Sequence, residues 1–193
     1  MNSQQIKEIL LSEIHEVSIN YEKYCNDPKR DFSRKRKLPF ELMLKNIIGM
    51  GSKSITNELI DIFQASGEMP SASAFVQQRT KIRPEALKAV FDGFMSRILT
   101  SADKMRILAV DGSDIQIETN PKDKTSHIST SIDKKSFNLL HLNALYDLEE
   151  HVYTDAIIQA AKSQNEHGAL NEMVDRSEIP KALVIADLSL IHI

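Results

Sequence analysis

The predicted fold depends most on one stretch of the sequence, Arg106-Ile-Leu-Ala-Val-Asp-Gly-Ser-Asp-Ile-Gln-Ile117. Its residues are apolar at both alternating positions from Ile107 to Val110, which is typical of a strand covered on both faces. After this run we expect Asp111 to lie in a turn with Gly112 and Ser113. A second segment, Ala182-Leu-Val-Ile-Ala-Asp187, has the same design. Two buried strands that each end in an aspartate can place two carboxylates side by side, and we expect the chemistry there.

Length and composition predict an ordinary soluble globular protein, either one domain or a small helical domain followed by a second one. The chain has 193 residues, of which 41% are hydrophobic and 26% charged, and its net charge is −3. The single cysteine, Cys25, excludes an internal disulfide and fits a reducing cytoplasm. No apolar run is long enough to span a membrane, and the N-terminus lacks the core of a signal peptide. We therefore expect a cytoplasmic protein.

Residues 1–100 are predicted to form a helical region. Between the first two predicted helices lies a basic segment with Lys29, Arg30 and the run from Arg34 to Lys37. Both a solvated linker and a phosphate-contacting patch fit this segment, since clustered Arg and Lys release counterions from nucleic acid. Apolar periodicity, prolines and possible caps predict helices over residues 4–25, 39–50 and 52–65, a shorter one beginning after Ser71 or Ser73, and another over 83–100.

The third and fourth predicted helices, separated by Gly67 and Pro70, resemble a helix-turn-helix whose second helix enters a major groove. A hairpin of helices that only packs into the core is favoured somewhat over base recognition, because any small helical bundle yields such pairs. The residues expected to contact DNA, if the region binds it, are Arg34, Lys35, Arg36, Lys37, Gln77, Gln78, Arg79 and Lys81.

From Met105 onward the pattern changes from helix to strand. The first three strands can form an antiparallel meander, and a helix before the fourth strand provides a crossover that makes that strand parallel to an earlier one. If the partner is the first strand, Asp111 and Asp187 lie at adjacent carboxyl ends, where ligands of open α/β sheets bind. The predicted elements are strands over 105–117, 136–146 and 151–159, a helix capped by Asn165 that runs to about Arg176, and a strand over 181–187.

Two close carboxylates repel each other, so the Asp111–Asp187 pair requires a cation. Oxygen ligands favour Mg²⁺ or Mn²⁺. A pair of such ions about 4 Å apart activates a water or hydroxyl and stabilises the leaving oxygen in phosphodiester chemistry. Aspartates at strand ends also commonly cap turns, and Asp111-Gly-Ser suits a turn. The matched pair in this strand order favours the metal site.

Four other ionisable residues are predicted to be structural. Asp114 is expected in the turn or beside the metal ligands, and His141 and His151 lie within predicted strands. Glu166 follows the predicted cap of a helix, where the helix dipole stabilises a carboxylate.

Six segments also resemble those of a known family. They are Ala109-Val-Asp-Gly-Ser-Asp114, Asn120-Pro-Lys-Asp123, Asn138-Leu-Leu-His-Leu-Asn-Ala-Leu-Tyr-Asp147, Tyr153-Thr-Asp-Ala-Ile-Ile158, Glu172-Met-Val-Asp-Arg-Ser177 and Val184-Ile-Ala-Asp187. Together they are similar to an insertion-sequence transposase of the DDE type, in the IS-four group, and the similarity covers essentially the whole chain through Asp187.

This resemblance implies an RNase H-like catalytic domain, with its first aspartate on strand one and its second at the end of strand four. Those roles fall on Asp111 and Asp187. It also implies a helical N-terminal region that binds transposon ends, and a dimeric complex with DNA. The implied chemistry is metal-dependent cleavage at transposon ends, followed by attack of a DNA 3′-hydroxyl on target DNA.

The chain departs from the family pattern after Asp187, where it reads Leu188-Ser-Leu-Ile-His-Ile193 instead of Arg-Gly-Tyr-Glu. These six residues look like the translation of a sequencing adapter, and the catalytic glutamate of the family has no counterpart. We therefore expect a truncated transposase with little or no strand transfer and with one sheet face partly uncovered. The expected parts are a helical region over 1–100, a partial RNase H-like domain over 101–187 and a non-native tail over 188–193.

The fold class expected is α+β, a helical region followed by a truncated, mixed RNase H-like sheet. Two other functions stay open. One is a DNA-binding fragment without catalysis that inhibits a full-length transposase, and it would not depend on Asp111 or Asp187. The other is a phosphotransferase with an aspartate nucleophile, ranked last because Asp111 and Asp114 are three residues apart whereas the phosphatase motif spaces its acids by two.

Overall fold

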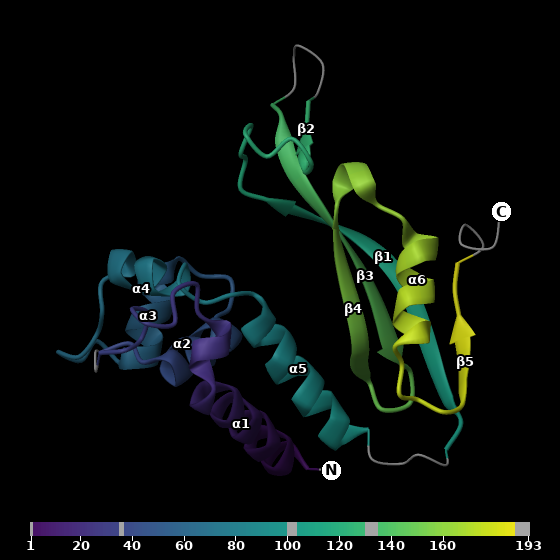
Figure 1. Ribbon diagram of the computed structural model, residues 1–193, viewed down its shortest axis with the longest axis horizontal. Helices are drawn as coiled ribbons and strands as arrows, with labels where there is room; N and C mark the ends of the chain where they lie inside the picture. Colours follow the sequence, from purple (N-terminus) through teal and green to yellow (C-terminus); the bar gives the residue numbers. More distant parts are fainter. Residues whose placement is uncertain (1, 35–36, 100–103, 130–134, 188–193) are drawn as a thin grey trace. The chain divides into compact units, whose positions relative to one another are not determined.

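The computed structural model describes residues 2–34, 37–99, 104–129 and 135–187. The chain divides into two compact units, Met1–Thr100 and Ser101–Ile193 (Figure 1). The first unit is helical, and the second contains a mixed β-sheet and one α-helix. Within the described ranges, no helix combines the length and the apolar character needed to cross a membrane.

Side-chain caps define where the helices of the first unit begin. Asn2 and Gln5 form a reciprocal capping box at the start of α1, and the hydroxyls of Ser54 and Ser71 accept backbone N–H groups at the starts of α3 and α4. The helices are α1 (Ser3–Ile19), α2 (Phe40–Gly49), α3 (Ile55–Phe63), α4 (Ala72–Arg79) and α5 (Glu85–Ile98), and a 3₁₀ turn η1 (Tyr21–Tyr24) follows α1.

Two apolar clusters hold this helical unit together. Ile14 of α1, Leu44 of α2 and Val90 of α5 belong to the first cluster. Met43 of α2 and Phe75 of α4 belong to the second. Because α2 presents neighbouring residues to both clusters, it is the element that joins the two halves of the core.

The connection between α3 and α4 differs from that of the helix-turn-helix that the sequence resembles. It runs from Gln64 to Ser71, which is longer than the turn of three or four residues in that motif. Gln64 and Ala65 have φ angles of 50° and 52°, so the chain leaves α3 through left-handed backbone conformations. This longer connection agrees better with the packing hairpin that the sequence favoured than with a helix-turn-helix.

The second unit is built on a five-stranded mixed sheet. The strand order is β2-β3-β1-β5, and β4 also pairs with β3. Strand β1 is antiparallel to β3 and parallel to β5, and α6 provides the crossover that reverses the chain before β5. The elements are β1 (Arg106–Ile117), β2 (His127–Ile128), β3 (Phe137–Asp147), β4 (Val152–Ala160), a 3₁₀ turn η2 (Ala161–Ser163), α6 (Glu166–Asp175) and β5 (Ala182–Ile185).

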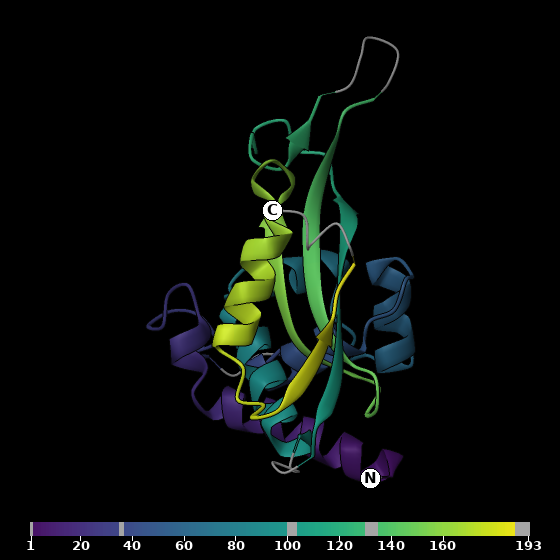
Figure 2. The ribbon, with the colours of Figure 1, turned by 90° about the vertical axis from the view of Figure 1, so that its right-hand side faces the viewer.

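Helix α6 covers one face of this sheet (Figures 1 and 2). Leu108 and Val110 of β1, Leu145 of β3 and Met173 of α6 form the buried cluster beneath it. The apolar residues near the end of the predicted helix suggest that Val174 faces inward together with Met173. This is wrong: Val174 is 47% exposed, because it lies one residue past Met173 on a different side of the helix.

The opposite face is less well covered. Leu183 and Ile185 of β5 are about half exposed, and Ile158 of β4 is 63% exposed. The helical first unit and the mixed sheet with its crossover helix make an α+β architecture that is consistent with an RNase H-like fold.

Candidate functional site

The two aspartates singled out by the sequence belong to neighbouring parallel strands in different ways: Asp111 lies within β1, opposite Ala144 of β3, and Asp187 lies two residues after the end of β5. The expectation that Asp111 enters a Gly-Ser turn is wrong, because β1 keeps its pairing with β3 through Gly112 and Ser113. The β1–β5 ladder pairs Arg106 with Ala182 and ends with Ala109 opposite Ile185. Asp111 and Asp187 each lie two residues beyond that last pair. Both strands run in the same direction, so the two carboxylates follow the same edge of the ladder.

Asp111 belongs to the face of the sheet that α6 does not cover. Val184 and Ala186 pack against the cluster beneath α6, and β5 ends at Ile185, two residues before Asp187. Val110 is buried in that cluster. Side chains alternate along a strand, so Asp111 lies on the face opposite to Val110. Both aspartates are exposed.

The donor chemistry of this pair fits a hard divalent cation. Asp111 Oδ1 accepts the N–H of Gly112 at 2.8 Å, which orients the carboxylate. Carboxylate oxygens on exposed strand ends are the ligands that Mg²⁺ and Mn²⁺ prefer, usually one or two together with water or substrate phosphates. In the described part of the chain, no group of three or more His, Cys, Asp or Glu side chains is arranged to hold a metal.

Beside Gly112, the residue after Asp111, a buried histidine lies between two carboxylates. His141 of β3 is opposite Asp114 of β1, and its Nδ1 is 2.9 Å from Asp114 Oδ1. Its Nε2 is 2.9 Å from Oε1 of Glu166 at the start of α6, a distance typical of an ion pair although the angle is poor for a hydrogen bond. The side chain of His141 is 6% exposed.

This His141 bridge depends on the absence of a side chain at residue 112. A Cβ at Gly112 would lie 2.6 Å from His141 Nε2 and 2.7 Å from Glu166 Oε1. The glycine next to Asp111 therefore leaves room for three elements to meet. The sequence indicated structural roles for His141, Asp114 and Glu166, but not that they meet. The strand register brings the first two together, and the position of α6 adds the third.

A second buried contact holds the other end of β1. Nη1 of Arg106 is 2.7 Å from Oδ2 of Asp147, and the two side chains are 3% and 0% exposed. The other oxygen of Asp147 accepts the backbone N–H groups of Glu149 and Glu150. Burial raises the pKa of Asp147, but these N–H donors and Arg106 outweigh burial, so its pKa lies below the ordinary value. The sequence analysis did not find this pair.

The residues expected to contact DNA occupy different environments in the helical unit. Arg34, Lys37, Gln77 and Arg79 are exposed, and Lys81 is half-buried. The expectation that Gln78 is exposed is wrong: it is 7% exposed, because its amide bonds to the carbonyl oxygen of Leu38 and to Lys81. Lys35, Arg36 and the tail over 188–193 lie outside the described residues.

A comparison with protein families gives one match in the second unit. Residues 102–189 match the family model described as the transposase DDE domain. No curated protein and no solved structure matches the chain. The matched segment contains both Asp111 and Asp187, and the match supports a DDE transposase, an enzyme class that acts in DNA transposition.

Proposed function

Taking the match to the transposase DDE domain as the premise, we propose that this chain acts in DNA transposition of the IS-four type, with Asp111 and Asp187 as its metal-binding catalytic carboxylates. The observation that carries this proposal is the parallel register of β1 and β5. Asp111 and Asp187 each lie two residues beyond the last pair of that ladder, Ala109 and Ile185. A turn-capping role for each aspartate alone would not require the two strands to be neighbours.

The ion proposed is Mg²⁺ or Mn²⁺. When bound, it supplies activation of a water or DNA 3′-hydroxyl and stabilisation of the leaving oxygen at the phosphodiester. Asp111 and Asp187 hold it through oxygen atoms, and the Gly112 N–H fixes one oxygen of Asp111. The exposed face leaves that edge accessible to a phosphodiester backbone.

The substrate proposed is DNA, both transposon ends and target, and the acting species is a homodimer in the DNA complex. Exposed basic residues of the helical unit support the DNA contact, with Arg34, Lys37 and Arg79 as phosphate-binding candidates. Gln77 is the exposed amide able to reach a base edge. We propose a cytoplasmic location for this reaction.

A DNA-binding inhibitor of a full-length transposase is the alternative, and it requires only the helical unit.

The test compares Asp111→Asn with Asp114→Asn. Both remove one carboxylate from β1 and differ in face, since Asp114 is bonded to His141 beneath α6. Free Mn²⁺ is measured by electron paramagnetic resonance during titration, and duplex DNA binding by fluorescence anisotropy. We expect Asp111→Asn to lower Mn²⁺ affinity at least fivefold and to leave DNA affinity within twofold, whereas Asp114→Asn keeps both.

Each outcome decides between the two functions. Equal Mn²⁺ affinity in the wild type and Asp111→Asn, with intact DNA binding, rejects the metal site and favours the inhibitor. Loss of Mn²⁺ affinity in both variants places the ion elsewhere on the sheet. Absence of DNA binding by the wild type rejects DNA as the partner of this chain.

A further inference from the structure

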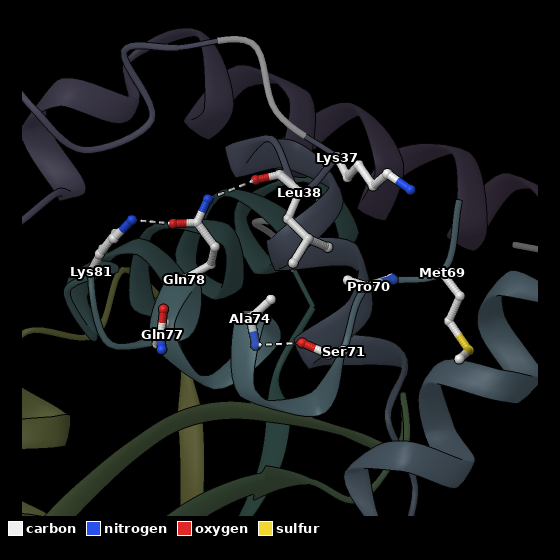
Figure 3. Close-up of a pocket in the computed structure, with 9 residues that line it drawn as sticks. All are labelled: Lys37, Leu38, Met69, Pro70, Ser71, Ala74, Gln77, Gln78 and Lys81. Atoms are coloured by element: carbon white, nitrogen blue, oxygen red, sulfur yellow. Dashed lines mark hydrogen bonds between the residues drawn. The ribbon is translucent and has the colours of Figure 1, made fainter. Parts of the chain in front are cut away.

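The helical unit contains a cavity of about 550 Å³, and two of its lining residues, Lys37 and Gln77, are among the DNA-contacting candidates of the proposed function. It lies beside α4, against the segment that precedes α2 and the segment that precedes α4 (Figure 3). Its volume is within the range of small-molecule sites, roughly 300–1,000 Å³. The described residues that line it include two lysines and no carboxylate, so the cavity favours an anionic ligand.

One wall of the cavity is a fixed polar chain. Lys81 donates to Oε1 of Gln78, and Nε2 of Gln78 donates to the carbonyl oxygen of Leu38 at 3.4 Å (Figure 3). An amide has two N–H donors and an oxygen with two lone pairs. Gln78 therefore keeps one N–H and one lone pair for a ligand, on a side chain that is held in place.

The remaining wall is apolar. Leu38, Met69, Pro70 and Ala74 contribute it, and Leu38 is 3% exposed. A flat ring packs well between apolar side chains while its edge bonds to fixed amides, which is how extrahelical bases are held in proteins. An amide edge and an apolar wall in one cavity thus fit a nucleobase better than a bare phosphate.

In Figure 3 Gln78 and Leu38 lie between the two lysines, and the side chain of Lys37 extends away from Lys81. Lys37 Nζ donates to the carbonyl oxygen of Gly67 and is 3.6 Å from the exposed Glu68, while Lys81 lies on the Gln78 wall. A nucleotide inside a DNA strand carries one phosphate on each side of its sugar. Two lysines separated by Gln78 and Leu38 match that charge pattern.

From this arrangement we propose that the cavity binds one unstacked nucleotide of a DNA strand, its base against the apolar wall and its flanking phosphates near Lys37 and Lys81. The proposal rests on the proposed function in taking DNA as the ligand. It deepens that function by assigning the helical unit a site for a single-stranded or distorted nucleotide, in addition to the backbone of a duplex.

The test uses the full chain and fluorescein-labelled DNA, with a single-stranded 20-mer and the blunt duplex of the same sequence. Ala74→Leu fills the cavity, and Ala72→Leu adds the same bulk on the same helix outside the lining. Lys81→Gln and Lys7→Gln remove one positive charge inside and outside the cavity. Thermal unfolding followed by circular dichroism checks that each variant is folded.

We expect the wild type to bind the single strand more tightly than the blunt duplex. Ala74→Leu should weaken single-strand binding roughly tenfold, the loss of one stacked base, and leave duplex binding within twofold. Ala72→Leu should change neither. Lys81→Gln should weaken single-strand binding more than Lys7→Gln does.

Several results would overturn the proposal. These are single-strand binding that survives Ala74→Leu, equal losses for single strand and duplex, or equal effects of the two lysine substitutions. Competition by an oligoglutamate peptide of equal net charge, as effective as the unlabelled single strand, would show an anion site without base recognition. If the duplex binds but no single-strand preference exists, this inference fails alone. If neither DNA binds, the DNA partner of the proposed function fails with it.

Discussion

Asp147→Asn tests whether the buried contact at the start of β1 stabilises the sheet. The substitution keeps the size of the side chain and an oxygen for the N–H groups of Glu149 and Glu150. It removes the negative charge 2.7 Å from Arg106, whose guanidinium then remains buried without that charge. Breaking a buried pair by removing one partner costs about 3–5 kcal/mol. For a unit of this size we expect the melting temperature to fall by at least about 12 °C.

The loss should depend on pH in a direction fixed by the pKa of Asp147. That pKa is lowered in the folded protein. The folded state then binds fewer protons than the unfolded chain, so the stabilisation is fully present above the unfolded pKa of about 3.9 and is lost as pH falls through the lower, folded value. The difference between wild type and Asp147→Asn should therefore be largest near pH 7 and smaller near pH 3.

The assay is urea unfolding followed by circular dichroism at both pH values. The control is Glu149→Gln, which breaks the exposed Lys104–Glu149 pair in the same turn and should cost less than about 1 kcal/mol. A cost for Asp147→Asn equal to that of Glu149→Gln, or a difference from wild type that grows as pH falls, would refute the reasoning.

Three further predictions concern the packing of both units. Gly112→Ala should lower the free energy of unfolding by roughly 1–3 kcal/mol, because the Cβ of the new alanine would clash with the buried ring of His141. An unchanged urea midpoint would contradict this. Arg176→Lys should lower the free energy of unfolding by about 1 kcal/mol, because Nε and Nη2 of Arg176 donate to both oxygens of Asp155 and a lysine cannot make this bidentate contact. An unchanged melting temperature would argue against a stabilising bidentate contact. Burial, and then nearby carboxylates, raise the pKa of Cys25 to about 11. Ellman's reagent at pH 8 should therefore react about 100-fold more slowly with the native than with the unfolded chain. Equal reaction rates would exclude the raised pKa.

Much of the sheet could be predicted because its strands carry local signals. The run around Ile107–Val110 and the alternation in the next two strands predicted β1, β3 and β4 to within one residue at each end. The crossover helix after Asn165 then allowed a parallel fourth strand, and β5 does pair with β1. The two-residue strand β2 was missed, because a pair such as His127–Ile128 has no periodicity of its own.

Contacts that depend on three-dimensional packing were beyond sequence reasoning. Arg106 and Asp147 are 41 positions apart in the sequence, and no local pattern around either residue predicts that they form a buried pair. Gln78 lies within a polar run that predicts exposure, yet a carbonyl oxygen forty residues earlier keeps it buried. Helical periodicity alone cannot show which polar residue the core accepts. The parallel pairing of β1 with β5 was predicted from the strand order, whereas the proximity of the Asp111 and Asp187 carboxylates and their metal site stay predictions.

The central claim is that one divalent ion lies between Asp111 and Asp187. The most direct measurement is paramagnetic broadening by Mn²⁺ in the nuclear magnetic resonance spectrum of ¹⁵N-labelled protein. The account predicts that low Mn²⁺ concentrations broaden the amide signals of Gly112 and Ala186 together, and that Asp187→Asn relieves the broadening at Gly112. Broadening confined to one strand, or concentrated at the exposed acidic turn Glu149–Glu150, would contradict the account.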